Sequence, residues 1–197
     1  MGLSPNAVLE RAKNLIMRII AGKYRGRRLA AVPRHVRPST DRLRETLFNI
    51  VASSIKESVW LDLFAGSGAV GIEALSRGAR HLILNDRSTR ALRLVRKNLE
   101  ICQVEESYEI SQSDVFVLLR KLEAPALDFV FLDPPRNFGR YEKLLKTVGD
   151  LAFLQPSTWV ILEAFKKTKL DCLPDTLNVF RRLRIADSQL VFLRPVE

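Results

Sequence analysis

Short runs with strand character alternate along the chain with segments whose apolar residues have helical spacing. This alternation is regular from about residue 56 onwards, and it closes with two adjacent strand-like runs. The predicted strands are 59–63, 81–84, 108–111, 127–132, 159–163, 178–185 and 189–193, and the predicted helices between them are 72–77, 88–102, 114–122 and 141–151. The pattern predicts an α/β fold: a doubly wound, mostly parallel, seven-stranded sheet with helices on both faces and a closing antiparallel pair.

The N-terminal part of the chain follows a different pattern. Residues 17–32 begin with apolar side chains and alternate around two glycines, which predicts a twisted β-hairpin. Beyond two prolines, Ser39 or Thr40 can cap a helix whose apolar stripe continues to Val51. The expected organisation is an N-terminal extension at 1–16, a basic hairpin-and-helix unit at 17–55 and a main domain at 56–197.

Positive charge is concentrated in this N-terminal part. The whole chain has a formal net charge of +10, and between residues 18 and 44 nine bases accompany one acid, Asp41. A basic block with glycine and tyrosine between the charges is typical of a polyanion binder. We therefore expect it to contact nucleic acid, with the following residues on the phosphates: Lys23, Arg25, Arg27, Arg28, Arg37 and Arg42.

Other features of the composition exclude several classes of protein. No apolar run approaches the roughly 20 residues that span a bilayer, and residues 1–16 lack the apolar core of a secretory signal, so a cytoplasmic protein is expected. Cys102 and Cys172 have no metal-binding spacing, and Cys102 lies on the apolar stripe of a predicted helix, which indicates a buried thiol. Because His35 and His81 are also scattered, no metal site is expected.

A glycine loop follows the first predicted strand. Residues 66–71 read GSGAVG, the spacing of the dinucleotide fingerprint, and Asp86 lies 20 residues beyond the first glycine. Alone this would indicate an NAD site. Asp62, however, places an anion beside the position of a pyrophosphate and would repel it. S-adenosylmethionine has no phosphate and carries a sulfonium and an ammonium, so we predict that cofactor.

Acidic residues follow the ends of successive predicted strands: Asp62, Asp86, Asp114 and Asp133. In a parallel sheet these ends open on the crevice where ligands bind. We predict that Asp62 contacts the methionine end of the cofactor, directly or through water, that Asp86 accepts from the ribose hydroxyls and that Asp114 accepts from the adenine amine. The loop residues Phe64, Ala65, Gly66 and Gly68 complete this site. A helix-capping or turn role stays open for each acid, above all for Asp114, which begins a helix.

The predicted strand at 127–132 ends in the corner Asp133-Pro134-Pro135-Arg136. Both prolines fix φ and lack a backbone donor, so the corner is rigid and extended. It presents the Asp133 carboxylate and the Pro134 carbonyl, which only accept hydrogen bonds and therefore suit a substrate amine. An ordinary turn would fit the three residues alone. Their position after the glycine loop, in line with the other acids, favours a functional site.

These motifs resemble a known family. Residues 62–71 (DLFAGSGAVG), together with the Asp-Pro-Pro corner, resemble class I methyltransferases that act on an exocyclic amine. Residues 18–29 (RIIAGKYRGRRL) and 37–50 (RPSTDRLRETLFNI) are similar to the bacterial 16S rRNA guanine-N2-methyltransferase family. The resemblance implies a Rossmann-like methyltransferase fold, S-adenosylmethionine as cofactor, one guanine of small-subunit rRNA as substrate, and rRNA or the small ribosomal subunit as partner. A monomer is expected.

The resemblance also implies a mechanism. Guanine N2 is a poor nucleophile because its lone pair is delocalised into the ring. Hydrogen bonds from its two N–H groups to Asp133 and to the Pro134 carbonyl would aim that lone pair at the methyl group, so catalysis would depend on positioning and electrostatics. Asp133 would take the released proton, directly or through water, and the base must leave its stack or already lie in a loop.

One position departs from the family pattern. The family usually has Tyr or Phe directly after the second proline, where the ring stacks on the target base, and this chain has Arg136 next to Pro135. A guanidinium plane also stacks on bases, and Phe138 lies two residues later. The sequence leaves the choice between Arg136 and Phe138 open.

Two other functions stay open on the sequence alone. The Asp-Pro-Pro corner does not choose among adenine, cytosine and guanine amines, so a DNA or tRNA amino-methyltransferase is an alternative. A cytosine-C5 enzyme is disfavoured because neither cysteine lies near a motif. A non-catalytic RNA-binding or ribosome-assembly factor would keep the fold, but the intact acids Asp62, Asp86 and Asp133 argue against it.

Overall fold

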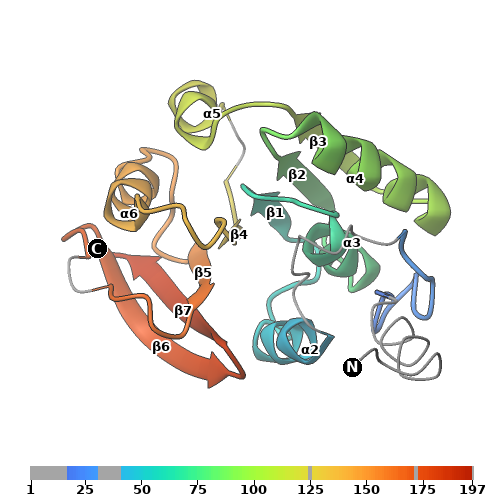
Figure 1. The fold of residues 1–197 in the computed structure, drawn as a ribbon, viewed down its shortest axis with the longest axis horizontal. Coiled ribbons are helices and arrows are strands. Elements are labelled where there is room, and N and C mark those ends of the chain that lie inside the picture. Colours follow the sequence, from blue (N-terminus) through green and yellow to red (C-terminus); the bar gives the residue numbers. More distant parts are fainter. Residues whose placement is uncertain (1–16, 31–40, 124–125, 171–172, 197) are drawn as a thin grey trace, which may run out of the picture.

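The computed structural model describes residues 17–30, 41–123, 126–170 and 173–196. Within these residues it contains one seven-stranded sheet in the order β3-β2-β1-β4-β5-β7-β6 (Figure 1). The strands are β1 (Val59–Asp62), β2 (His81–Asn85), β3 (Ser107–Ser111), β4 (Phe129–Leu132), β5 (Trp159–Phe165), β6 (Leu177–Ile185) and β7 (Ser188–Pro195). The first five are parallel, and β7 runs antiparallel to both β5 and β6. The predicted fold class and the closing antiparallel pair are confirmed.

Helices cover both faces of this sheet. They are α2 (Asp41–Ile50), α3 (Ala69–Ser76), α4 (Thr89–Cys102), α5 (Val115–Lys121) and α6 (Tyr141–Gly149). Successive side chains of β1 point to opposite faces: Trp60 packs in the apolar cluster that includes α2, α3 and α4, whereas Val59 and Leu61 pack in the cluster that includes α5 and α6. The sheet therefore has a separate core on each side. In the part of the chain that the structure describes, no helix is long and apolar enough to cross a membrane.

The strand order places a ligand crevice beside β1. The chain passes from β1 through β2 to β3 on one side of β1, and then returns to β4 on its other side. In open α/β sheets, ligands bind outside the carboxyl ends of the strands at such a reversal. The loops after β1 and β4, which hold the glycine motif and the Asp-Pro-Pro corner, therefore lie next to each other.

The N-terminal segment 17–30 keeps the antiparallel pairing of the predicted hairpin, but over one bridge only. Its two ends are joined by backbone hydrogen bonds, from Leu29 N to Met17 O at 2.8 Å and from Ile19 N to Arg27 O at 3.0 Å. The one bridge among these residues, between Arg18 and Arg28, is too short to form strands. The segment is a looped arm closed at its base. The predicted caps Ser39 and Thr40 and the extension 1–16 lie outside the described residues.

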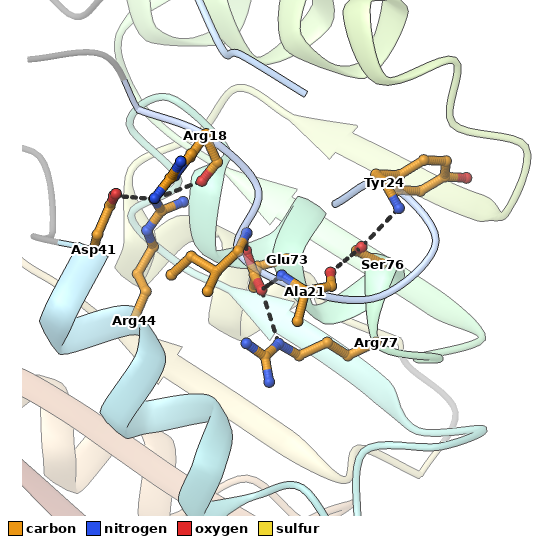
Figure 2. A network of polar contacts seen from close by, with 9 residues as sticks. Arg18, Ala21, Tyr24, Asp41, Arg44, Glu73, Ser76 and Arg77 are labelled. Carbon is orange, nitrogen blue, oxygen red and sulfur yellow. Dashed lines mark hydrogen bonds and ion pairs between the residues drawn. The ribbon is translucent and has the colours of Figure 1, made fainter. Parts of the chain in front are cut away.

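The buried carboxylate of Glu73 on α3 holds this arm against the main domain (Figure 2). It accepts hydrogen bonds from the backbone N–H groups of Ile20 and Ala21, at 2.7 and 3.0 Å. Arg77, which follows the last residue of α3, donates to the same carboxylate at 2.8 Å. A buried charge is tolerated here because several donors and a counter-charge surround it.

The arm also approaches the end of α3 closely. Lys23 N donates to Ser76 O at 2.7 Å, and Tyr24 N donates to the Ser76 hydroxyl at 2.9 Å (Figure 2). Gly22 has φ +82°, and a Cβ at this position would lie 1.7 Å from Ser76 O. Only glycine fits both the conformation and the contact. Tyr24 itself is buried in the same core as Trp60, so the arm and the sheet share one apolar core.

Candidate active site

A cleft of about 600 Å³ lies at the carboxyl ends of the parallel strands. A volume of this size suits a small-molecule or cofactor site. Many of the predicted cofactor and base-binding residues line it: Phe64, Gly66, Asp86, Asp114, Asp133, Pro134, Pro135, Arg136 and Phe138. The structure thus brings the glycine loop, two strand-end acids and the Asp-Pro-Pro corner to one place.

Three predicted cofactor residues are buried behind the cleft rather than in its wall: Asp62, Ala65 and Gly68. Gly68 has φ +78° and precedes the first turn of α3, so it shapes the loop through its backbone. The contacts of these residues with a cofactor stay a prediction. The predicted RNA contact Arg37 lies outside the described residues.

Asp86 joins the glycine loop to the loop after β2. Its Oδ2 accepts from Gly66 N at 3.0 Å, and its Oδ1 accepts from Ser88 N at 2.8 Å. These bonds fix the loop, which turns at Gly66 with φ +55°. A carboxylate has about four acceptor positions, so the structural bonds leave capacity for the predicted ribose hydroxyls.

Asp114 caps helix α5. Its Oδ1 accepts from Phe116 N at 2.9 Å, and its backbone is extended, as at an N-cap. The capping role that the sequence left open is therefore real. Because Asp114 also lines the cleft, it is held in place for the predicted contact with adenine, which stays a prediction.

Two acids at the cleft, Asp62 beneath it and Asp133 in its wall, have raised pKa values. Burial raises the pKa of Asp62 to about 7, and the nearby Asp86 adds to the rise, while a 3.3 Å hydrogen bond from Phe64 N opposes it. Burial also raises the pKa of Asp133 well above its ordinary value, with further contributions from Glu163 and Asp62. A cationic ligand would relieve this repulsion. Such displaced pKa values in a cleft are typical of functional sites.

The two candidates for base stacking have different surroundings. Phe138 belongs to an aromatic cluster, with its ring centroid 5.4 Å from that of Phe64 and 6.3 Å from that of Phe116. The Arg140 guanidinium lies 5.0 Å from the centroid of the Phe138 ring. Arg136 instead lies over Phe165 of β5, with 4.6 Å between the guanidinium carbon and the ring centroid.

Sequence reasoning missed several residues that line the cleft: Arg140, Tyr141, Glu163, Phe165 and Ser188. The sequence could have indicated Glu163, because this acid ends the predicted strand 159–163. The predicted site acids lie at or after the ends of other strands in the same way. Ser188 comes from the start of β7 and donates to Glu163 Oε1 at 3.0 Å. Nothing in the local pattern indicates that pairing.

The basic residues of the N-terminal part divide into two groups. Lys23 pairs with Glu105 and Glu106 at 2.9 Å, and the Arg27 guanidinium lies 5.1 Å from the Tyr24 ring centroid. Arg44 is fully buried, where it donates to Arg18 O and to Asp41 (Figure 2). The predicted RNA contacts Arg25, Arg28 and Arg42 are exposed. Fewer basic side chains are thus available to a polyanion than the number in the sequence indicates.

The strand order, the glycine loop and the cleft at the strand ends are those of the class I methyltransferase fold. The family model described as Conserved hypothetical protein 95 matches residues 17–194, and the chain belongs to this family. It is 37% identical over 157 residues to ribosomal RNA small subunit methyltransferase D of Haemophilus influenzae, covering 78% of this chain and 81% of that protein. It is 34% identical over 165 residues to putative rRNA methyltransferase YlbH of Bacillus subtilis, covering 82% and 88%.

A solved structure is also similar. The putative methyltransferase yhhF from Escherichia coli aligns with a TM-score of 0.79 at 32% identity, covering 91% of this chain and 97% of that one. The likeness covers nearly the whole of both chains, which agrees with the family match.

Proposed function

We propose that this protein transfers a methyl group from S-adenosylmethionine to the exocyclic N2 amine of a guanine in 16S rRNA. The names of the similar proteins support an rRNA methyltransferase, and one of them a small-subunit enzyme. The observation that carries the proposal is the position of Asp133 and Pro134 in the cleft, directly after β4, which is the strand next to the one that leads into the glycine loop. An acceptor pair for an amine thus lies beside the predicted cofactor site.

The residues present fit S-adenosylmethionine. Phe64 and Gly66 form one wall, Asp86 and Asp114 provide acceptors for ribose and adenine, and Asp62 supplies negative charge beneath the methionine end. The bound cofactor supplies an electrophilic methyl group and a positive charge. That charge favours the ionised forms of the buried acids, which their surroundings otherwise disfavour.

Asp133 and Pro134 act on the amine. The ionised Asp133 carboxylate accepts one N–H of the base, and the Pro134 carbonyl accepts the other. The two bonds fix the plane of the amine and direct its lone pair towards the methyl group. Asp133 then takes the proton that the amine releases on methylation. Its raised pKa suits this role, because a carboxylate with a higher pKa is a stronger proton acceptor.

The test is Asp133→Ala, assayed on small-subunit rRNA and subunits from cells that lack the gene. Methyl transfer should fall by at least about 10³-fold, since positioning and proton transfer are both lost. Binding of S-adenosylmethionine, measured by calorimetry, should change only a few-fold. Asp150→Asn, a change at an exposed acid at the end of α6, is the matched control.

Mass spectrometry of the methylated RNA identifies the base. Methylation at guanine N2 supports the proposal, and methylation of an adenine or cytosine amine would contradict it. Retained transfer by Asp133→Ala would refute the mechanism. No binding of S-adenosylmethionine to the unmodified protein would instead favour a non-catalytic RNA-binding factor.

A further inference from the structure

The carboxyl end of β5 lies directly beside the Asp-Pro-Pro corner. Leu132 of β4 pairs with Leu162 of β5, so Asp133 and Glu163 are the next residues on neighbouring strands, roughly 5 Å apart at the backbone. Because side chains alternate along a strand, Glu163 and Phe165 share one face of β5, and Asp133 continues that face on β4. All three line the cleft.

The strand order separates this end of β5 from the cofactor loop. In the order β1-β4-β5, β1 leads into the glycine loop, β4 carries Asp133, and β5 lies on the far side of Asp133 from that loop. A cofactor bound at the glycine loop reaches Asp133 from one side. The group that receives the methyl must then reach Asp133 from the side of β5.

We propose that the carboxyl end of β5 is the base-binding subsite, where Glu163 selects guanine through its N1–H and where Phe165 with Arg136 forms the stacking surface. This inference rests on the proposed function. Enzymes that act on an extruded base read its Watson–Crick edge with hydrogen bonds and hold its faces by stacking. The carboxyl end of β5 offers both kinds of group next to the acceptor for the amine.

Guanine, adenine and cytosine differ at the ring nitrogen beside the amine, and this difference explains why an acid at position 163 would select guanine. In guanine, the ring nitrogen N1 beside the amine carries a hydrogen, so the N1–H and the amine present two adjacent donors to the protein. In adenine and cytosine, the corresponding ring nitrogen is an acceptor, which a carboxylate repels. Asp133 and Pro134 accept from any amine, whereas a second carboxylate beside them accepts only from guanine.

Ser188 positions Glu163. Its hydroxyl donates to Glu163 Oε1 at 3.0 Å, and Ser188 is itself held opposite Phe165 by the pairing of β5 with β7. A carboxylate with about four acceptor positions can hold the serine and accept from the base as well.

Arg136 and Phe165 provide a flat surface at the same place. The Arg136 guanidinium lies 4.6 Å from the Phe165 ring centroid, and both side chains line the cleft. Phe138 contacts Phe64, Phe116 and Tyr141 instead. The pair of Arg136 and Phe165 therefore takes the role that a single aromatic residue after the second proline would have, because both guanidinium and ring planes stack on bases.

The edge contact is tested with small-subunit RNA in which the mapped guanine is replaced by 2-aminopurine. That base keeps the 2-amino group, but its N1 is an acceptor. The unmodified protein should methylate guanine at least 100-fold faster than 2-aminopurine. Glu163→Gln, whose amide can donate to N1, should reduce this preference below about tenfold. Ser188→Ala should give an intermediate preference.

The measured preference for guanine over 2-aminopurine distinguishes a failure of the Glu163 assignment from a failure of the proposed function. If the unmodified protein does not methylate guanine N2, the proposed function itself is wrong. If it does, and Glu163→Gln keeps the full preference for guanine, only the role of Glu163 is refuted. Because the preference is a ratio measured on one protein, a general loss of stability does not change it. Calorimetry with S-adenosylmethionine confirms that each variant is folded.

The stacking surface is tested with Phe165→Leu, and Phe180→Leu, at an exposed ring of β6 outside the cleft lining, serves as the matched control. Phe165→Leu should raise KM for RNA roughly tenfold, the scale of one lost base-stacking contact. Phe180→Leu should leave KM for RNA within about twofold. An unchanged KM in Phe165→Leu, or an equal rise in both variants, would overturn the assignment.

Discussion

At the scale of single residues, the buried carboxyl group of Asp62 makes the folded protein less stable when it is ionised. Its side chain is 1% exposed, and burial raises its pKa from 3.8 to about 7. The folded state therefore binds this proton more tightly than the unfolded chain. The stabilising contribution of the proton is complete below about pH 3.8 and is lost as the pH rises through about 7. Such a carboxyl group is typical of a ligand site rather than of a structural ion pair.

Asp62→Asn should therefore stabilise the ligand-free protein at pH 8. The amide keeps an oxygen that can accept from Phe64 N, and it removes the buried charge. The expected gain in the free energy of unfolding is on the order of 2–4 kcal/mol at pH 8 and below about 1 kcal/mol at pH 4.5. Chemical denaturation at both pH values measures it. The same variant should bind S-adenosylmethionine more weakly.

The control for Asp62→Asn is Asp128→Asn. Asp128 Oδ2 accepts from Val59 N at 2.7 Å, and the amide that replaces it can still accept that bond. This variant should show no gain at pH 8. An equal effect of Asp62→Asn at both pH values would show that its carboxyl does not titrate near 7.

At the scale of elements, the main domain was predictable, whereas the contacts that hold the N-terminal arm were not. Strands such as β1 and β4 are buried runs whose ends are marked locally, by Asp62 and by the Asp-Pro-Pro corner. The N–H groups of the arm instead donate to Glu73, more than 50 residues away. No local pattern contains such a partner. The contact of Arg136 with Phe165 could not be predicted for the same reason, since the two residues lie far apart in the sequence. Glu163, in contrast, lies at a strand end like the predicted acids, and the sequence analysis missed it.

Glu73→Gln should release the arm from α3. The amide presents N–H groups where the carboxylate accepts from Ile20 N and Ala21 N, so one donor faces another. The free energy of unfolding should fall by about 1–3 kcal/mol, the cost of buried donors left without a partner. Hydrogen exchange at the Ile20 and Ala21 amides should accelerate at least tenfold.

Glu45→Gln is the matched control for Glu73→Gln, because Glu45 is exposed on the neighbouring α2. It should leave exchange at Ile20 and Ala21 unchanged. If Glu73→Gln also left that exchange unchanged, the arm would be held by its apolar contacts, with Tyr24 in the core, and the carboxylate would contribute little.

At the scale of the whole molecule, the arm carries exposed charge that is not part of the cleft lining. Figure 1 shows segment 17–30 on the side of the molecule that carries α3 and α4, while the closing strands β6 and β7 lie at the opposite edge of the sheet. Arg25 and Arg28 are exposed on this arm. An rRNA substrate is large enough to contact the arm while its target base occupies the cleft. We therefore expect the arm to contribute to affinity and the cleft to contribute to chemistry.

Arg25→Gln with Arg28→Gln should weaken RNA binding without slowing transfer at saturating RNA. Each phosphate contact contributes about 0.7–0.9 to the slope of log K against log salt concentration, so the slope should become shallower by about 1.5. Filter binding over a range of salt concentrations measures it. Arg120→Gln with Lys121→Gln removes the same charge from the last turn of α5 and should change the slope by less than about 0.5. Equal changes in both double variants would mean that net charge alone steers the RNA, and the arm would have no specific role in binding.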